Sequence, residues 1–230
     1  MNGLNKIKAA VFDLDGTLVD SAPDLHAAVN KLMGEMQLPG IGLPIVISFV
    51  GNGIPMLVRR ALDHNKTSTS PDVLEPAVKR FMALYAQAPA ERTIVYPGVV
   101  DALKAFKNSG VRLGICTNKA ESLSRVVLAD LGIADLFEVV VGGDTLPTRK
   151  PDPAGLLLAI NQLDADAQTA LYVGDSEVDA ETADKLGLRF ALFKRGYRKA
   201  PVSELPHWKA FDDMRELTAA LRLSAETATG

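Results

Sequence analysis

Asp13-Leu14-Asp15-Gly16-Thr17-Leu18 follows directly on the apolar run Ile7–Phe12, and this stretch indicates how the chain folds. Side chains alternate along an extended chain, so Asp13 and Asp15 can face one spot while Leu14 packs away from it. Gly16 lets the backbone turn immediately afterwards. A strand that is apolar on both faces and ends in polar groups is typical of an open α/β sheet, in which ligands bind at the carboxyl ends of the strands.

Further apolar runs of strand length follow along the chain. They are Arg112–Cys116, Phe137–Val141, Ala170–Val173 and Arg189–Phe193. The helical patterns between them end in a glycine followed by an apolar residue, as at Gly110, Gly132 and Gly187, which is typical of a helix end that leads into a strand. This alternation predicts parallel β-α-β units and a doubly wound parallel sheet.

The alternation stops between about Ser21 and Tyr96, where the pattern predicts amphipathic helices and no convincing strand. Apolar residues recur at helical spacing over 25–36, 54–62 and 74–85. Ile45–Phe49 is ambiguous and fits either a helix or a strand. The sequence therefore predicts an α/β core formed by 1–19 and 97–230, interrupted by an all-helical domain over 20–96.

Composition excludes several classes of protein. The 230 residues include 25 Lys and Arg against 28 Asp and Glu, a net charge of −3, which argues against binding to nucleic acid or to an anionic membrane. Cys116 is the only cysteine, so no internal disulfide can form, and no secretory signal is apparent. No apolar run approaches the roughly 18 residues of a membrane span. A cytoplasmic protein, monomer or homodimer, is expected.

A second acidic motif repeats the geometry of the first. Asp175 follows the run that ends in Val173-Gly174, and Asp179 lies one helical turn further on. Together with Asp13 and Asp15 these residues place four acids at two strand ends. Oxygen ligands of this kind suit Mg²⁺, which prefers a few carboxylates together with waters and a substrate phosphate.

Anion-binding groups follow the other predicted strands. Thr117-Asn118 ends one strand and offers a hydroxyl and backbone N–H groups at a helix start. Lys150 supplies a cation on a turn stiffened by Pro151. Each feature alone is common as a cap, a turn or a surface side chain. Their arrival in order at successive strand ends favours one joint site.

These motifs resemble those of the haloacid dehalogenase superfamily, in which a type 1 helical cap lies between the first two motifs. The run 19–25, the loop Gly51-Asn52-Gly53, Tyr96-Pro97-Gly98 and the run 142–147 resemble the bacterial phosphoglycolate phosphatase family. The resemblance covers nearly the whole chain. It implies a Mg²⁺-dependent phosphatase that acts on a small phosphorylated metabolite.

The resemblance also implies roles for the motif residues. Asp13 would be the nucleophile that forms an aspartyl-phosphate, and Asp15 the general acid and base. The carboxylates of Asp13 and Asp175 and the backbone carbonyl of Asp15 would bind Mg²⁺, with Asp179 just beyond these ligands. The phosphoryl oxygens would be held by the groups of the second and third motifs, Thr117, Asn118 and Lys150.

Several alternatives stay open. Gly51-Asn52-Gly53 fits a substrate-facing cap loop and a plain turn equally well. Arg59 and Arg60 could clamp a substrate carboxylate or lie on a solvated helix face. A phosphosugar phosphatase, for example for N-acetylmuramate 6-phosphate, and a β-phosphoglucomutase-like enzyme compete with 2-phosphoglycolate hydrolysis, as does a binding protein without turnover. Asp15 favours a phosphate ester over a haloacid, because a halide leaves without a proton.

Overall fold

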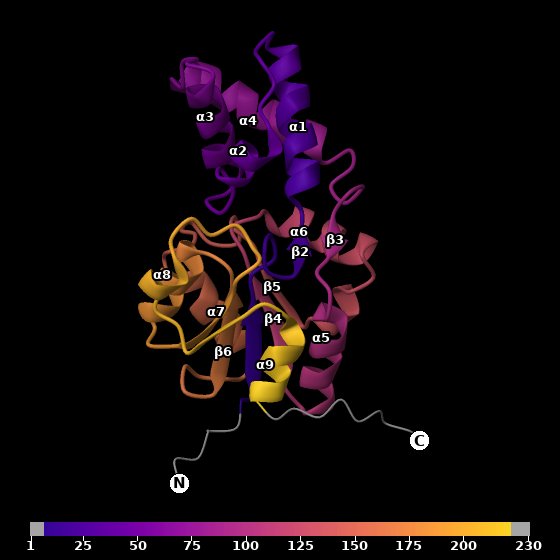
Figure 1. Ribbon diagram of the computed structural model, residues 1–230, viewed down its shortest axis with the longest axis vertical. Helices are drawn as coiled ribbons and strands as arrows, with labels where there is room; N and C mark the ends of the chain where they lie inside the picture. Colours follow the sequence, from indigo (N-terminus) through magenta and orange to yellow (C-terminus); the bar gives the residue numbers. More distant parts are fainter. Residues whose placement is uncertain (1–6, 222–230) are drawn as a thin grey trace.

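The computed structural model describes residues 7–221, and its centre is a six-stranded parallel sheet (Figure 1). The strand order is β5-β4-β1-β6-β7-β8, and every neighbouring pair is parallel. The strands are β1 Ala9–Phe12, β4 Arg112–Cys116, β5 Val139–Val141, β6 Ala170–Gly174, β7 Arg189–Phe193 and β8 Lys209–Phe211. The predicted doubly wound sheet is thus confirmed, with one edge strand, β8, that the sequence pattern missed.

Helices cover both faces of the sheet because both faces are apolar. Along β1, Ala10 and Phe12 pack into one hydrophobic cluster and Ala9 and Val11 into the other. The first cluster includes side chains of α5 Val99–Asn108, α6 Glu121–Asp130 and α9 Met214–Ala220. The second includes side chains of α7 Ala154–Gln162 and α8 Glu177–Asp184. Short 3₁₀ helices span Ala134–Leu136 and Val202–Glu204.

The register of the sheet brings the carboxyl ends of its central strands together. Phe12 at the end of β1 pairs with Ile115 of β4 on one side and with Val173 of β6 on the other. Because the strands are parallel, the residues that follow each of them emerge at the same edge. This edge faces the second domain, as Figure 1 shows.

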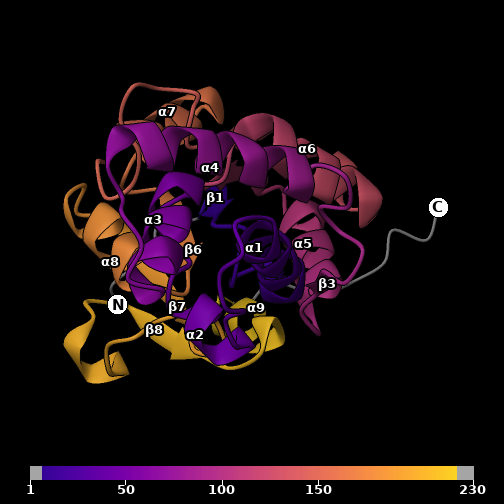
Figure 2. The same cartoon turned by 90° about the horizontal axis from the view of Figure 1, so that it is seen from above.

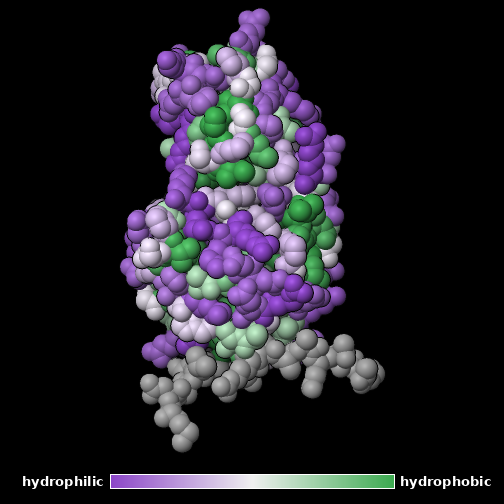
Figure 3. Space-filling view, viewed as in Figure 1, coloured by the Kyte–Doolittle hydropathy of each residue, from purple (hydrophilic) through white to green (hydrophobic). Residues whose placement is uncertain are grey.

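The second domain is all-helical and packs around a hydrophobic cluster of its own. It contains α1 Ala22–Glu35, α2 Leu43–Ile47, α3 Ile54–His64 and α4 Pro71–Tyr85. The ambiguous stretch 45–49 is therefore mostly helical. Seen from above, the helices lie across the carboxyl edge of the sheet, as a cap does (Figure 2). On the face drawn in Figure 3, hydrophobic residues are exposed on this cap. Leu43 and Ile45 of α2 are among the exposed hydrophobic residues of the chain.

A two-stranded antiparallel ribbon joins the domains, and it corrects the prediction that 21–96 contains no strand. Val19 and Asp20 form β2, which pairs with β3, Ile94–Val95. A strand of two residues is too short to produce a recognisable alternation. None of the helices within 7–221 is long and apolar enough to cross a membrane.

Asp24 fastens the cap to this ribbon. It is only 4% exposed and its carboxylate accepts hydrogen bonds from the backbone N–H groups of Arg92 and Thr93, at 2.8–3.1 Å, and from the Thr93 hydroxyl at 2.7 Å. These bonds fix the start of α1 against the chain that returns to the core.

Replacing Asp24 with alanine should destabilise the protein, because the two N–H groups and a hydroxyl lose their acceptor. We expect Asp24→Ala to lower the free energy of unfolding by about 2–4 kcal/mol, measured by urea denaturation. Asp72, an exposed acid in the first turn of α4, provides the control, and Asp72→Ala should cost less than about 1 kcal/mol. Equal losses for the two variants would contradict this role of Asp24.

Candidate active site

The predicted site residues of the core converge at the carboxyl edge of the sheet. Asp13 follows β1, Thr117 follows β4 and Asp175 follows β6, and they are 8%, 3% and 1% exposed. The parallel register places them side by side although more than 150 positions separate the first from the last. Asp175 is held from both sides: its carboxylate accepts hydrogen bonds from the Thr17 hydroxyl and from the Tyr197 N–H, at 2.8 and 2.6 Å.

Lys150 is the buried cation among these acids. Its Nζ lies 2.6 Å from Asp179 Oδ1 and 2.9 Å from Asp13 Oδ1, and donates a hydrogen bond to the Tyr172 hydroxyl at 2.8 Å. Tyr172 in turn donates to Asp179 Oδ1 at 2.7 Å. Burial disfavours the charged form, but the attraction of Asp13 and Asp179 outweighs it and raises the pKa of Lys150. The ammonium therefore stays charged.

Asp179 lies at the start of α8 in a capping box with Ser176. Its Oδ2 accepts hydrogen bonds from the Ser176 hydroxyl at 2.7 Å and from the N–H groups of Ser176 and Asp175, at 3.1 and 3.2 Å. Burial opposes its ionisation, yet Lys150 and these donors keep the pKa of Asp179 below its usual value. Gly174 is needed here, since a Cβ on it would lie 2.4 Å from Asp179 Cβ.

Three buried acids could hold a divalent cation. Asp13, Asp175 and Asp179 each offer one carboxylate oxygen, and these oxygens lie within 4.8 Å of one another. Burial raises the pKa of Asp13 to about 6 and that of Asp175 well above its usual value, and the charge of Asp179 adds to both shifts. The ammonium of Lys150, 2.9 Å from Asp13 Oδ1, lowers the pKa of Asp13 but does not cancel the effect of burial. Hard oxygen ligands whose charges repel one another fit Mg²⁺.

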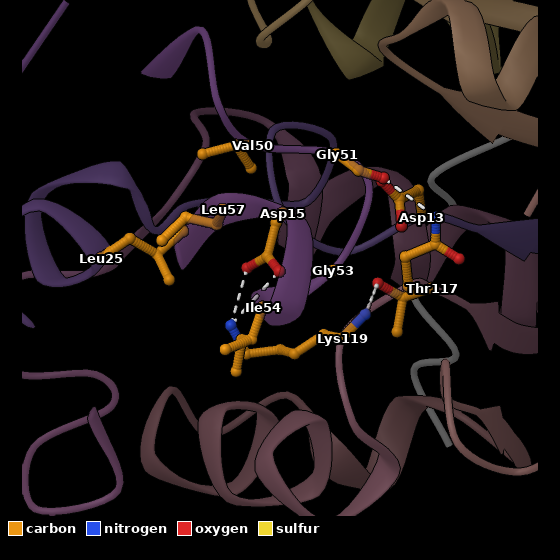
Figure 4. Close-up of a pocket in the computed structure, with 11 residues that line it drawn as sticks. Asp13, Asp15, Leu25, Val50, Gly51, Gly53, Ile54, Leu57, Thr117 and Lys119 are labelled. Carbon is orange, nitrogen blue, oxygen red and sulfur yellow. Dashed lines mark hydrogen bonds and ion pairs between the residues drawn. The ribbon is translucent and has the colours of Figure 1, made fainter. Parts of the chain in front are cut away.

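Asp15 lines the same pocket as Asp13, as the alternation along the chain predicted, but it is held by different partners (Figure 4). Its carboxylate accepts a hydrogen bond from the Ser21 hydroxyl at 2.6 Å. It also forms an ion pair with Lys119, whose Nζ lies 3.0 and 3.2 Å from the two oxygens. Lys119 donates as well to the hydroxyl of Tyr85, at the end of α4 in the cap, at 2.7 Å.

Sequence reasoning missed Lys119, Tyr85 and Tyr172. The position of Lys119 directly after Thr117-Asn118 was the available signal. A lysine beside a motif nevertheless fits an exposed side chain, and the side chain of Lys119 is only 2% exposed. The two tyrosines sit in an apolar helix face and an apolar strand, where a core role is the ordinary interpretation.

Asn118 connects the core to the cap. Its side-chain amide donates hydrogen bonds to Gly51 O at 2.9 Å and to Lys150 O at 3.0 Å. Both amide protons are therefore engaged, which leaves its backbone as the donor toward a bound anion. The loop Gly51-Asn52-Gly53 thus faces the site, and Gly51 and Gly53 line the pocket.

The two arginines of α3 form hydrogen bonds within the cap. Arg60 donates to Phe49 O at 2.7 Å and to Asn52 Oδ1 at 2.8 Å, so it braces the cap loop. Arg59 donates to the Thr69 hydroxyl at 3.4 Å. Neither is among the described residues that line the pocket, which leaves no direct support for the carboxylate clamp considered for them.

The pocket between the domains is small and has two kinds of wall (Figure 4). Its volume is about 40 Å³, enough for a few water molecules. The core supplies the polar wall, Asp13, Asp15, Thr117, Asn118 and Lys119. The cap supplies an apolar wall, Leu25, Val50, Ile54 and Leu57, together with Gly51 and Gly53.

Comparisons with known proteins agree with this architecture. Residues 10–193 match the model of the haloacid dehalogenase-like hydrolase family. A phosphoglycolate phosphatase of Cereibacter sphaeroides is 49% identical over 214 residues, which cover 92% of this chain and 96% of the relative. The solved structure of a predicted phosphoglycolate phosphatase from Haemophilus somnus 129PT superimposes with a TM-score of 0.89 at 30% identity, covering 95% of this chain and 99% of the other.

A β-phosphoglucomutase from Clostridium difficile has a TM-score of 0.75 at 20% identity, over 92% of this chain and 93% of the other, and shares the fold. The chain therefore belongs to the haloacid dehalogenase-like hydrolase family, and its expected resemblance to the phosphoglycolate phosphatases is confirmed. It is an enzyme of phosphatase type with an acidic triad compatible with a metal ion.

A methyl group at Gly196 should disturb the site, because a Cβ there would lie 2.2 Å from Asp175 Oδ2 and 2.3 Å from Gly16 O. We expect Gly196→Ala to lower the free energy of unfolding by about 1–3 kcal/mol. Gly34, an exposed glycine of α1 at which an added Cβ would meet nothing within 4 Å, is the matched control. Gly34→Ala should raise stability by about 0.5–1 kcal/mol. Thermal unfolding of both variants checks this, and an unchanged Gly196→Ala would contradict it.

Proposed function

We propose that this enzyme is a Mg²⁺-dependent phosphomonoesterase that hydrolyses 2-phosphoglycolate to glycolate and phosphate through an aspartyl-phosphate on Asp13. The observation that carries the proposal is the convergence of Asp13, Asp15, Thr117 and Lys119 on one pocket closed by the cap. The names of the relatives at up to 49% identity support the choice of substrate.

Asp13 is placed to act as the nucleophile. It is buried at the end of β1, and Lys150 lies within ion-pair distance of its Oδ1. Attack on phosphorus would form an O–P bond to Asp13 and break the bond to the leaving oxygen. Thr117 and the backbone of Asn118, at the end of β4, would hold the phosphoryl oxygens, and Lys150 would offset the negative charge around the nucleophile.

Asp15 is placed to move the proton. In the first step it would protonate the oxygen of the departing alcohol, and in the second it would take a proton from the water that attacks phosphorus. Ser21 and Lys119 orient its carboxylate from two sides. Asp13, Asp175 and the backbone carbonyl of Asp15 would hold Mg²⁺, with Asp179 just beyond these ligands, and the ion would supply positive charge to the phosphoryl oxygens.

The cap would select the substrate and exclude water. We propose that it comprises 20–96 and moves about the two chain crossings, Asp20-Ser21 and Tyr96-Pro97-Gly98. Tyr197 of the core donates to Asp20 Oδ1 at 2.7 Å and accepts from the Ala22 N–H at 2.9 Å, which ties the first crossing to the core. Closure brings the loop 51–53 over the phosphoryl site.

The pocket favours a small substrate over a phosphosugar. Its cap wall consists of aliphatic side chains and two glycines, so sugar hydroxyl groups buried there would lack hydrogen-bond partners. A two-carbon acid presents only a methylene group to such a wall. The same consideration argues against a phosphosugar mutase, which must place a second sugar hydroxyl in line with the phosphoryl group.

A phosphate-release assay tests the proposed function. Purified enzyme with Mg²⁺ should hydrolyse 2-phosphoglycolate faster than hexose phosphates, N-acetylmuramate 6-phosphate or nucleoside monophosphates, and should lose activity in EDTA. Asp13→Asn should reduce kcat by roughly 1,000-fold or more, because the nucleophile is removed. Absence of Mg²⁺-dependent hydrolysis of any ester would refute the proposal, and a phosphosugar hydrolysed fastest would replace the substrate.

The stability of the protein should depend jointly on Mg²⁺ and pH. A carboxyl group that is harder to ionise in the folded chain weakens the fold as pH rises from its unfolded to its folded pKa, and for Asp13 this interval runs from 3.8 to about 6. The metal-free protein loses this contribution across the interval and does not regain it above pH 6. Because Mg²⁺ favours the ionised acids, it should raise Tm more at about pH 8 than at about pH 5.

Thermal unfolding in Mg²⁺ and in EDTA at both pH values measures this dependence. Asp13→Asn should reduce the difference between the two pH values. A shift in Tm that is equal at both, or larger at the lower one, would contradict the placement of Mg²⁺ at Asp13.

A further inference from the structure

We propose that Lys119 recognises a carboxylate on the leaving group, so that the enzyme selects phosphomonoesters of short α-hydroxy acids over neutral esters of the same size. The inference rests on the proposed phosphatase function and deepens it. It concerns the part of the pocket beyond the phosphoryl group, where neither Arg59 nor Arg60 reaches.

The positive charge of this pocket comes from Lys119. Among the described residues that line this pocket, it is the one cation. Figure 4 shows its Nζ on the side of Asp15 that faces the cap residues Leu25 and Leu57, away from Asp13 and Thr117. A leaving group that extends from the phosphoryl site past Asp15 toward the cap therefore meets this ammonium.

The geometry matches the length of an α-hydroxy acid. Nζ lies 3.0 Å from the nearer oxygen of Asp15, the residue placed to protonate the bridging oxygen. In a phosphorylated α-hydroxy acid, a single carbon separates that bridging oxygen from the carboxylate. Because this spacing is short, the groups that contact the bridging oxygen and the carboxylate must be adjacent on the protein, as Asp15 and Lys119 are. The remaining wall, Leu25, Ile54 and Leu57, suits the methylene group.

The ammonium retains bonding capacity for a substrate. An ammonium group has three donors, and the Asp15 carboxylate and the Tyr85 hydroxyl lie on two sides of it. Within residues 7–221, no other acceptor forms a hydrogen bond with Nζ. The N-cap of α3, Gly53, and the first residue of this helix, Ile54, also line the pocket, so the start of α3 adds the favourable end of a helix dipole for an anion.

Tyr85 holds the ammonium in place. Its ring centroid lies 4.7 Å from Nζ, and its hydroxyl accepts the hydrogen bond at 2.7 Å. Burial disfavours the charge, but Asp15 and Tyr85 outweigh burial and raise the pKa of Lys119. Because Tyr85 belongs to the cap, the carboxylate site is complete only when the cap is closed.

Two esters that differ in charge and little in size test the proposal. In 2-hydroxyethyl phosphate, a hydroxymethyl group replaces the carboxylate of 2-phosphoglycolate. The wild-type enzyme should prefer 2-phosphoglycolate in kcat/KM, and Lys119→Met should reduce this preference between about 10- and 100-fold, mainly through KM. Lys119→Arg should keep part of the preference, and Tyr85→Phe should lower it less than Lys119→Met.

Lys104→Met is the matched control. Lys104 is an exposed lysine of α5 that is not among the described residues lining the site, and its replacement should leave the ratio of the two kcat/KM values unchanged. p-Nitrophenyl phosphate, whose leaving group needs no proton, reports whether the phosphoryl site of each variant is intact.

The outcomes distinguish recognition of the carboxylate by Lys119 from a role of Lys119 in positioning Asp15. If Lys119→Met slows both small esters by the same factor, Lys119 only positions Asp15 and the proposal is wrong. It is also wrong if the wild-type enzyme shows no preference, or if Lys104→Met abolishes the preference. If Lys119→Met does not fold, Tyr85→Phe and wild-type inhibition by glycolate, compared with ethylene glycol, decide in its place. Inactivity of the wild-type enzyme toward every ester would overturn the proposed function and this inference with it.

Discussion

The site depends on the ion pairs that the buried ammonium of Lys150 forms with Asp13 and Asp179. Asp13, Asp175 and Asp179 approach one another in a region almost closed to solvent, where like charges repel strongly. Lys150 pairs with Asp13 and with Asp179, and Tyr172 bridges it to Asp179. This cation lets Asp179 remain ionised, while Asp13 and Asp175 still favour protonation or a further cation. A divalent metal is the natural complement.

Close backbone approach makes this density of charge possible. A Cβ at Gly174 would collide with Asp179, and one at Gly143 would lie 2.4 Å from Asn118 O. The close approach of Gly143 to Asn118 supports the loop that follows β4. That loop carries Thr117 into the pocket, Asn118 to the cap loop and Lys119 to Asp15. Three consecutive residues therefore connect the proposed phosphoryl site, the cap loop and the proposed site of the leaving group.

Much of the fold could be predicted because its signals are local. The buried strands are near-continuous apolar runs, and the cap interrupts them with helical periodicity. The polar residues at strand ends, such as Asp13 and Thr117, could be located because parallel strands share one carboxyl edge. β3 has only two residues, and β8, Lys209-Ala210-Phe211, does not form an apolar run as the equally short β5 does with its three valines, so neither strand could be detected.

The parts of the site that escaped prediction depend on long-range pairing. Lys119 meets Tyr85 across 34 positions and across the domain boundary, and nothing in either local sequence indicates the contact. Arg60 was considered for substrate binding, but the fold directs its guanidinium to the backbone and side chain of its own cap loop. Local sequence gives the residue type, and only the packed structure gives the partner.

The most direct test of this account is detection of phosphate on Asp13. Asp15→Asn should accumulate the intermediate from p-nitrophenyl phosphate, because that leaving group needs no acid while the hydrolysis of the aspartyl-phosphate needs a base. Acid quenching followed by mass spectrometry of the peptide that contains Asp13 is predicted to show one phosphate on that residue. A phosphate on another residue, or rapid release of p-nitrophenol without any phosphoenzyme, would contradict the central claim.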